Sequence, residues 1–433
     1  MLSVGIDVGT SGVRCAAINQ QGDVICTTSV VMPSPIVSWD RPAQDPQIWW
    51  DAATQCLRDL TCELNQTDYS SVDIGALAVD GTSGTMVLVD SDLTPLSPGL
   101  MYNSAGFNEH AEFVREVAPP ISIVQGNASG LARLMFMLQA CGSAGIVGVL
   151  HQADWIAARL RGEERLSDET NSLKTGYDPI EGRWPSWIES LVPVDVLPQV
   201  VPAGSGFGIV CKDAAAMTGL PEGVRLVAGV TDSNAAFLAS GASRPGDGVT
   251  SLGSTLAIKL LSSQPISDPT RGIYSHKIGD MWLPGGASNT GGAVLRKYFS
   301  DDQLQSLSRQ LQPEIETGLA YYPLVGPGER FPISDLTLPP RLSPRPTDDA
   351  QFLQGMLEGM AKIERTGYDS LTDLGAPTLQ RVFSAGGGAA NSGWTAIRKR
   401  ALECEMMEAA SAEAAVGTAR LAAGLVPASH STS

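Results

Sequence analysis

One short pattern occurs twice, far apart in the chain. At residues 6–11 and again at residues 250–255, an apolar run ends in glycine and hydroxyl residues, and a second apolar run follows. Each copy predicts two strands joined by a tight turn, at residues 9–12 in the first and 253–255 in the second. Two such hairpins predict an internally duplicated α/β fold with two related lobes, whereas a fixed-period solenoid is not indicated.

A third glycine-rich turn follows another apolar run, at residues 386–388. Main-chain amides of such turns can hold an anion, and small residues let phosphate oxygens approach the backbone. None of the turns carries the lysine of a phosphate-binding P-loop, and none has the G-x-G-x-x-G spacing of a dinucleotide-binding βαβ unit. Taken alone, the turn at residues 9–12 is an ordinary Gly-rich hairpin. Together with the duplication they indicate the actin/hexokinase/Hsp70 type of ATP-binding fold.

An aspartate marks the end of another apolar run. Residues 226–230 predict a buried strand, which ends at Thr231-Asp232, and a helix of small residues begins just after. The Asp232 carboxylate is then expected at the carboxyl end of a strand, where open α/β folds bind ligands. The alternative role for Asp232 is a helix N-cap.

Periodicity predicts the remaining elements. Helices are expected at 45–64, 129–140, 151–161, 349–371, 392–402 and 413–421, and strands at 74–79, 85–89 and 381–384. Residues 179–202 and 331–346 are rich in proline and predict loops. The Gly-, Ser- and Pro-rich stretch at 241–248 is the expected domain boundary. It divides the chain into lobes at 1–241 and 242–424, followed by a tail at 425–433.

Composition narrows the possible partners. The 433 residues are enough for two to three domains, and 46 acidic residues against 29 basic ones give a net charge of -17. This balance argues against broad contact with nucleic acid or an anionic membrane, both of which need a basic face. An anionic ligand must therefore be held by local dipoles and a metal ion.

The cysteines and the N-terminal segment bear on the compartment. The seven cysteines show no C-x-x-C spacing, so neither a zinc site nor a disulfide framework is indicated. The first residues enter an apolar strand at once, without a targeting segment, and no apolar run is long enough to span a membrane. We expect a cytoplasmic protein; a plastid location would need a longer precursor.

Three segments carry a resemblance to a known family. Gly5-Ile6-Asp7-Val8-Gly9-Thr10-Ser11, Gly229-Val230-Thr231-Asp232 and Ser384-Ala385-Gly386-Gly387-Gly388 with Asn391 stand in the order and spacing of the FGGY carbohydrate kinases, which the chain resembles over residues 2 to 424. The resemblance implies an α/β fold of two duplicated actin/hexokinase-like (ribonuclease H-like) lobes around a central cleft, with ATP and Mg²⁺ as cofactors.

The resemblance also implies the roles of individual residues. Asp232 corresponds to the catalytic base, which accepts the proton of the sugar hydroxyl. Asp7 corresponds to an acid that lies near the sugar and near Mg²⁺, which it holds through water. The residues expected to bind the sugar are Asp7, Thr82, Ser83, His151 and Asp232. Those expected to bind ATP are Gly9, Thr10, Ser11, Gly253, Ser254, Thr255, Gly387, Gly388, Asn391 and Trp394.

For several of these side chains a structural role is the alternative. His151 can be a helix-start histidine with no ligand, and Trp394 can pack in the core instead of on adenine. Arg14 can assist the phosphates or be a solvated strand residue. Asp154 is expected to be structural, as an acid in the first helical turn.

The chain is similar in particular to the compact xylulokinase-like proteins of cyanobacteria and plants, which are similar to D-ribulose kinases. Asp80-Gly81-Thr82-Ser83 and His151-Gln152-Ala153-Asp154-Trp155 fit that subgroup. Many family members carry Asp and Arg after an aromatic-Asn pair, where this chain has Tyr102-Asn103-Ser104-Ala105-Gly106-Phe107, which puts the exact sugar in doubt.

The expected reaction is therefore phosphorylation of a pentulose, D-ribulose to D-ribulose 5-phosphate, by an ATP:sugar phosphotransferase. D-xylulose is the alternative substrate within the family. A non-enzymatic ATP-binding protein of the actin/Hsp70 type and a sugar sensor without turnover are the alternatives from other classes. The expected partners are a small sugar and ATP, without nucleic acid or membrane. No sequence feature fixes the oligomeric state.

Overall fold

The chain forms two compact units. The computed structural model describes residues 1–428 except 143 and 163–164, so the last five residues of the predicted tail lie outside the described part. The first unit comprises 1–239, 276–279 and 413–426, and the second comprises 240–275, 280–412 and, of the described residues at the end, 427–428.

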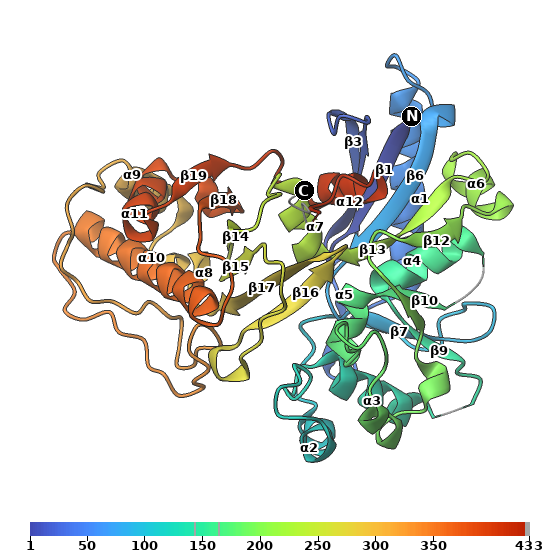
Figure 1. Cartoon of the computed structure of the whole chain (residues 1–433), viewed down its shortest axis with the longest axis horizontal. Helices are drawn as coiled ribbons and strands as arrows, with labels where there is room; N and C mark the ends of the chain where they lie inside the picture. Colours follow the sequence, from blue (N-terminus) through green and yellow to red (C-terminus); the bar gives the residue numbers. More distant parts are fainter. Residues whose placement is uncertain (143, 163–164, 429–433) are drawn as a thin grey trace. The chain divides into compact units, whose positions relative to one another are not determined.

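The first unit is built on a six-stranded sheet with the order β12-β13-β6-β1-β2-β3 (Figure 1). Its strands are β1 (Leu2–Val8), β2 (Gly12–Ile18), β3 (Val24–Val31), β6 (Ile74–Gly81), β12 (Gly206–Ile209) and β13 (Arg225–Thr231). β1, β6 and β13 run parallel to one another, while β2 and β3 are antiparallel additions beside β1. The carboxyl ends of the three parallel strands therefore meet at one edge of the sheet.

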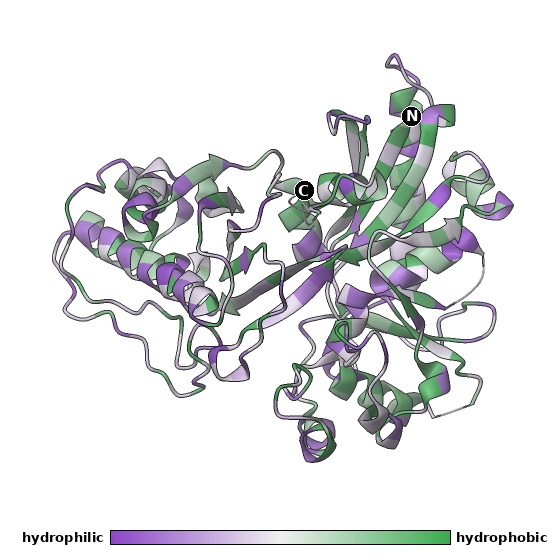
Figure 2. Ribbon diagram, viewed as in Figure 1, coloured by the Kyte–Doolittle hydropathy of each residue, from purple (hydrophilic) through white to green (hydrophobic). Residues whose placement is uncertain are grey.

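Helices cover the faces of this sheet. α12 (Ala414–Ala422) packs on β1, β6 and α7 (Asp232–Ala239), whereas α1 (Pro46–Leu64) and α4 (Gln152–Arg161) pack against other parts of the sheet. Two glycines permit the close packing of α12: a Cβ at Gly5 would overlap the carbonyl of Ala415, and one at Gly417 would overlap that of Ala235. The strands are largely hydrophobic, as Figure 2 shows, and their side chains form the main core with α1 and α4.

The rest of the first unit surrounds a five-stranded sheet with the order β4-β5-β8-β7-β9. Its strands are β4 (Ile36–Ser38), β5 (Arg41–Gln44), β7 (Met86–Val89), β8 (Gly99–Leu100) and β9 (Gly148–His151). The remaining elements are α2 (Asn108–Val117), α3 (Gly130–Cys141), the strand pair β10 (Leu166–Asp168) and β11 (Gln199–Val201), α5 (Glu169–Ser172) and α6 (Lys212–Thr218). β9 leads directly into α4, which places the start of α4 near the end of β6.

A second six-stranded sheet has the order β16-β17-β15-β14-β18-β19. Its strands are β14 (Asp247–Leu252), β15 (Leu256–Leu260), β16 (Tyr274–Ile278), β17 (Met281–Ser288), β18 (Arg381–Ala385) and β19 (Glu405–Glu408). β14, β18 and β19 are parallel, and β15 and β17 are antiparallel additions beside β14. This is the arrangement of β1, β6, β13, β2 and β3, so the predicted duplication is confirmed at the level of topology.

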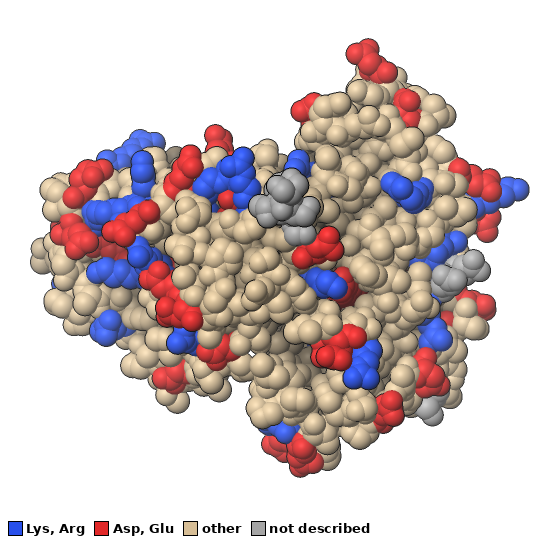
Figure 3. All heavy atoms as spheres, in the orientation of Figure 1, with Lys and Arg blue, Asp and Glu red and all other residues tan. Residues whose placement is uncertain are grey.

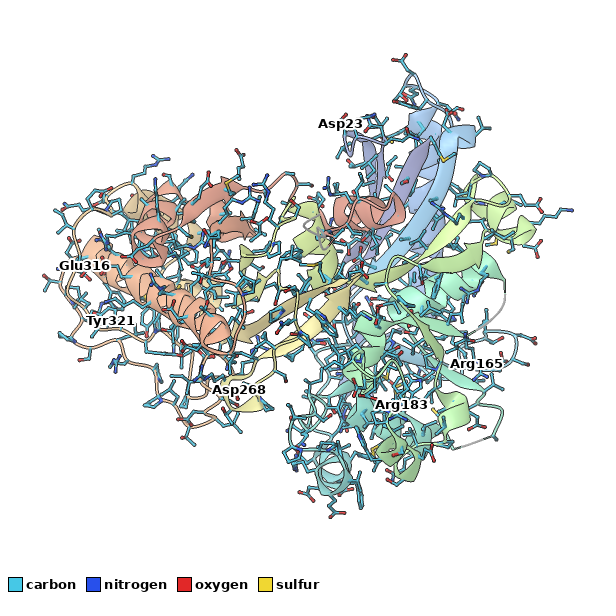
Figure 4. The ribbon with its side chains drawn as sticks, in the orientation of Figure 1. Asp23, Arg165, Arg183, Asp268, Glu316 and Tyr321 are labelled. Carbon is cyan, nitrogen blue, oxygen red and sulfur yellow. The ribbon has the colours of Figure 1, made fainter. Side chains whose placement is uncertain are left out.

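The helices of the second unit are α8 (Gly292–Arg296), α9 (Asp301–Ser308), α10 (Asp349–Asp373) and α11 (Ser392–Leu402). The apolar face of α10, which includes Phe352, Met356 and Met360, forms a core with β14 and β15. Tyr321, labelled in Figure 4, adds its ring to this core edge-on to Phe352, with the ring centroids 5.8 Å apart.

Most of the predicted elements are present, with some differences. The sequence predicts a hairpin at residues 273–283, but its second strand continues to Ser288, because Gly285 and Gly286 remain in β17. The sequence also predicts a helix that reaches Phe299, but α8 ends at Arg296. α2, α9 and β19 were not predicted. α2 and α9 are short and polar, so they offer little periodicity to read.

The surface carries both signs of charge. On the face drawn in Figure 3, acidic and basic side chains are interspersed. Among the helices of the described residues, none has both the length and the apolar character needed to cross a membrane.

Candidate active site

Three aspartates lie at the carboxyl ends of the three adjacent parallel strands of the first unit. Asp7 on β1 is the register partner of Asp80 on β6. Thr231, the last residue of β13, is the partner of Gly81, and Asp232 follows it as the first residue of α7. The sequence analysis selected Asp7 and Asp232 as site residues. The structure brings both to one sheet edge and adds Asp80 between them.

Asp7 combines burial with a cationic neighbour. Arg14 lies opposite it in the β1–β2 hairpin, and the Arg14 Nη1 group donates to Asp7 Oδ2 at 3.3 Å. Burial raises the pKa of Asp7 above its ordinary value, although the charge of Arg14 acts in the opposite direction. Arg14, whose two possible roles the sequence left open, therefore pairs with a site carboxylate.

Asp80 is fully buried, with 0 % of its surface exposed. Its Oδ2 accepts a hydrogen bond from the hydroxyl of Thr418 on α12, while its Oδ1 has no hydrogen-bond partner among the described residues. Burial raises the pKa of Asp80 well above its usual range, and the charges of Asp7 and Asp232 raise it further. The sequence analysis named this residue only within the segment 80–83; its position at the end of a predicted strand, like that of Asp7, was the available signal.

Asp232 is half-buried at the start of α7. Its Oδ1 accepts a hydrogen bond from the main-chain N–H of Ser233 at 2.7 Å. An N-cap side chain accepts from the N–H two or three residues further on, so this bond to the adjacent residue does not by itself make Asp232 an N-cap.

The loop after β6 carries the predicted sugar residues Thr82 and Ser83. The hydroxyl of Thr82 lies 2.6 Å from that of Thr85 and donates to Gln152 Oε1 at 2.7 Å. Ser83 Oγ is buried without a partner among the residues that the structure describes. Its hydroxyl therefore has unused hydrogen-bonding capacity at the sheet edge.

An arginine holds this loop from α3. Arg133 is 1 % exposed, and its guanidinium group donates to the carbonyl oxygens of Gly84, Tyr102, Ser104 and Ala128. Burial lowers the pKa of Arg133 to about 10. Arg133 thus ties the loop after β6 to the segment 102–107, in which the chain departs from the family pattern.

His151 lies beside this loop in a closed hydrogen-bond set. Its Nδ1 is 3.1 Å from Asp154 Oδ2 and its Nε2 is 3.0 Å from the hydroxyl of Thr175, and all three side chains are buried. A sugar contact from His151 would have to replace one of these two bonds. Asp154, which the sequence analysis expected to be structural, also accepts a hydrogen bond from Ser167 Oγ at 2.6 Å.

The turn between β1 and β2 is held by its main chain. The Gly9 N–H donates to the Gly12 carbonyl at 3.0 Å, and the carbonyls of Thr10 and Ser11 accept from Gln44 Nε2 and the Met32 N–H at 3.0 and 2.8 Å. These carbonyls are therefore occupied by protein donors. The Thr10 and Ser11 side chains make no hydrogen bond that the structure records among the described residues.

The second unit contains a cavity of about 690 Å³, within the size range of small-molecule sites. Six of the predicted ATP-binding residues line it, namely Gly253, Ser254, Gly387, Gly388, Asn391 and Trp394. Thr255 is not among the lining residues. The cavity thus collects residues from the β14–β15 turn and from the segment between β18 and α11, as the sequence analysis expected of a nucleotide site.

The segment between β18 and α11 closes one wall of this cavity. A Cβ at Gly388 would overlap the ring of Trp394, whereas one at Gly387 would meet no atom within 4 Å. Asn391 caps α11 by accepting from the Trp394 N–H at 3.0 Å, and its Nδ2 donates to Ser308 Oγ at 2.8 Å. Trp394 is almost fully buried and belongs to the core as well as to the cavity wall, so its core packing is observed and its contact with adenine stays a prediction.

Two arginines in the wall were missed by the sequence analysis. Arg296 at the end of α8 and Arg309 after α9 line the same cavity, and Arg296 Nε donates to Asp301 at 3.0 Å. Arginine is well suited to phosphate groups, because its planar guanidinium presents several donors. α9 was not predicted, so its neighbour Arg309 gave no signal in the sequence.

The acids of the first unit can be compared with the ligands that Mg²⁺ prefers. No group of three or more His, Cys, Asp or Glu side chains within residues 1–428 is arranged to hold a metal ion, with residues 143 and 163–164 outside that search. Mg²⁺ usually keeps several waters and takes one or two carboxylates together with substrate phosphates. Asp7, at the carboxyl end of β1, fits that smaller donor set.

Two equivalent mixed sheets, one with acids at its strand ends and one with a glycine-lined cavity, are features of the actin/hexokinase-like class of ATP-binding folds. The FGGY family of carbohydrate kinases matches this chain with its N-terminal domain at residues 2–122 and its C-terminal domain at residues 248–425. The chain belongs to the FGGY family of carbohydrate kinases.

Relatives and solved structures agree with this assignment. The xylulose kinase of Escherichia coli (strain K12) is 24% identical over 294 residues, which are 64% of this chain and 58% of that protein. The xylulose kinase of Streptomyces coelicolor (strain ATCC BAA-471 / A3(2) / M145) is 25% identical over 468 residues, covering 98% of this chain and 88% of the relative. The crystal structure of the xylulose kinase from Rhodospirillum rubrum superposes with a TM-score of 0.84 at 25% identity, covering 98% of this chain and 89% of that one.

The two-domain α/β fold predicted from the sequence is therefore confirmed. This chain spans only 58% of the length of the Escherichia coli relative, less than two thirds.

Proposed function

We propose that the protein is an ATP:sugar phosphotransferase that phosphorylates a pentulose, with D-ribulose as the substrate and D-ribulose 5-phosphate as the product. The observation that carries this proposal is the position of Asp232 at one sheet edge with Asp7 and Asp80. Membership of a carbohydrate kinase family supports the reaction type.

In this proposal Asp232 acts as the general base. Phosphoryl transfer depends on positioning and charge stabilisation more than on covalent chemistry by the protein. The Asp232 carboxylate accepts the proton of the attacking sugar hydroxyl as the γ-phosphoryl group leaves ATP. Asp7, Thr82 and Ser83 hold the other sugar hydroxyls, and His151 contributes only if it exchanges one of its present bonds.

ATP occupies the cavity of the second unit. Gly387 and Gly388 leave room beside Trp394 for the base and ribose, and Gly253 and Ser254 lie at the cavity wall where main-chain amides can meet phosphate oxygens. Arg296 supplies a positive charge. Gly9, Thr10, Ser11 and Thr255 keep their predicted phosphate-binding role as part of the proposal. Mg²⁺, held by Asp7 through water, supplies charge neutralisation for the phosphates when bound.

D-xylulose is the second candidate substrate, because the relatives named above are xylulose kinases. We favour D-ribulose because of the segments at residues 80–83 and 151–155, which resemble the compact D-ribulose kinases. The structure adds that Asp80, Thr82 and Gln152 from these two segments meet around the end of β6.

A coupled ADP-release assay over a panel of sugars tests the proposal. We expect ADP release with D-ribulose to exceed that with D-xylulose, and glycerol to be the poorest substrate. Faster turnover of D-xylulose or glycerol would contradict the choice of D-ribulose while leaving the kinase activity standing. If no sugar of the panel stimulated ADP release, the kinase proposal itself would be wrong.

A further inference from the structure

The side-chain amide of Gln152 is held in one orientation. Gln152 is the first residue of α4 and is fully buried. Its Oε1 accepts from the main-chain N–H of Thr82 at 3.1 Å and from the Thr82 hydroxyl at 2.7 Å. A main-chain N–H can only donate, so the atom that faces it must be the amide oxygen. Rotating the amide by half a turn would lose the bond from the main-chain N–H and bring two N–H groups face to face.

This anchoring leaves the amide nitrogen unused. Gln152 Nε2 is buried and has no hydrogen-bond partner among the residues that the structure describes. A buried donor without a partner is unfavourable, and each such group in a folded protein calls for an explanation. An oxygen atom of a bound ligand would supply the missing acceptor.

Gln152 lies at the sheet edge that carries the candidate active site. A Cβ at Gly81 would approach Gln152 Oε1 to 3.2 Å, so the amide packs directly on the end of β6. Gly81 is also the register partner of Thr231, the residue before Asp232. Ser83 Oγ and Thr231 Oγ1 are further buried oxygens of this edge without partners in the described part of the chain. Unused polar atoms from three elements thus gather around Gly81.

We propose that Gln152 is a substrate-binding residue whose Nε2 donates to the carbonyl oxygen of an open-chain ketose, and that it distinguishes ketoses from polyols. This inference rests on the proposed sugar kinase function. A carbonyl oxygen only accepts hydrogen bonds, so it fits a donor that is fixed in place. A hydroxyl in the same position would also need an acceptor for its own proton, and the oxygen of this amide already receives two hydrogen bonds from Thr82. The carbonyl oxygen of a ketose therefore needs only the Gln152 donor, whereas a polyol hydroxyl in its place must find a further acceptor for its proton.

The substitution Gln152→Met tests the inference, because methionine has a similar length and lacks both polar atoms. Binding is measured by calorimetry without ATP, with D-ribulose and with ribitol, which carries a hydroxyl in place of the ketose carbonyl. The wild-type protein is expected to bind D-ribulose more tightly than ribitol. Gln152→Met is expected to weaken D-ribulose binding by about 10-fold, the effect of one neutral hydrogen bond, and to change ribitol binding by less than about 2-fold. Gln55→Met, on the exposed surface of α1, is the control and is expected to bind both as the wild type does.

Thr82→Val provides a second variant in case Gln152→Met does not fold. It removes one of the two bonds to Gln152 Oε1 and keeps the main-chain bond, so a smaller loss of preference for D-ribulose is expected. Equal weakening of both ligands in the variants, unchanged D-ribulose binding, or no binding of D-ribulose to the wild type would each overturn the inference. If the wild type bound D-ribulose through Gln152 but released no ADP with any sugar, the proposed reaction would be wrong and the binding role of Gln152 would stand.

Discussion

At the scale of single residues, the role of Asp232 has two explanations, one chemical and one structural. Its carboxylate lies at the start of α7, where it accepts a hydrogen bond from the N–H of the next residue, Ser233, and it also shares a sheet edge with Asp7 and Asp80. Asparagine has nearly the same shape as aspartate, and its side-chain oxygen can still accept a hydrogen bond from a main-chain N–H at a helix start, because Asn stabilises helix starts as well as Asp does. It cannot accept the proton of a sugar hydroxyl.

Asp232→Asn is therefore expected to lower kcat by about 10²–10⁴-fold, the usual contribution of a general base. The melting temperature and the affinity for ATP are expected to remain close to those of the wild type. Steady-state kinetics with the best sugar, thermal denaturation and nucleotide binding measure the three quantities. Near wild-type turnover in this variant would assign Asp232 a structural role only.

The sequence predicted two of the three acids but could not predict how they meet. Asp7 and Asp232 follow apolar runs, which is a local signal, whereas their approach to Asp80 depends on the pairing of β1, β6 and β13. From the sequence, His151 was predicted to bind the sugar, and Gln152 was named only within the segment 151–155. Only the hydrogen bonds show that the ring nitrogens of His151 are engaged and that the amide nitrogen of Gln152 is not.

At the scale of elements, α3 positions the loop after β6. Arg133 reaches from this helix to the carbonyl of Gly84 in the loop and to those of Tyr102 and Ser104 in the segment 102–107. Helix 129–140 was predicted from its periodicity, but the direction in which Arg133 points depends on packing against residues far away in the sequence. A buried arginine is rarely predicted from sequence, since arginine is mostly exposed.

Arg133→Met is expected to raise KM for the sugar by about 10-fold or more, because the loss of its charged hydrogen bonds frees the loop that carries Thr82 and Ser83. KM for ATP is expected to stay unchanged, since the cavity of the second unit lacks Arg133. Arg133→Lys is expected to restore part of the loss. Arg115→Met is the matched control, because Arg115 on α2 also donates to a carbonyl, that of Gln125, but is exposed. Equal changes in KM for both substrates would indicate that Arg133 only stabilises the fold.

At the scale of the whole molecule, stability depends on pairs such as Asp247 and Arg381. These residues lie opposite each other on β14 and β18, and Arg381 donates two hydrogen bonds to Asp247 at 2.8 and 2.7 Å. Burial by itself raises the pKa of Asp247, but the bonds from Arg381 and from the N–H groups of Ser243 and Arg244 outweigh it and leave the pKa below its ordinary value.

A carboxyl group whose pKa is lowered in the folded state stabilises the protein at pH values above the pKa of the same group in the unfolded chain, which is about 3.9 for aspartate. That stabilisation is lost as the pH falls through the lower, folded-state pKa. Asp247→Asn is expected to reduce the free energy of unfolding at pH 7 by about 1.5–3 kcal/mol and to flatten its decline at acidic pH. Urea denaturation at several pH values measures both. Asp369→Asn, which breaks an exposed pair with Arg365, is expected to change stability by less than about 1 kcal/mol, and a similar loss in both variants would contradict the special role of Asp247.

The position of α12 in the sequence has a consequence for biosynthesis. All strands of the sheet that carries Asp7 and Asp80 lie before residue 232. α12 covers this sheet, with Thr418 bonded to Asp80 and its main chain packed on Gly5. It is translated only after all of β14 to β19. During translation this face of the sheet stays uncovered while the second unit emerges from the ribosome. The hydrogen bond from Thr418 to Asp80 can form only after α12 has been made. The first unit therefore begins to emerge before the second unit but cannot be completed until the second unit has been translated.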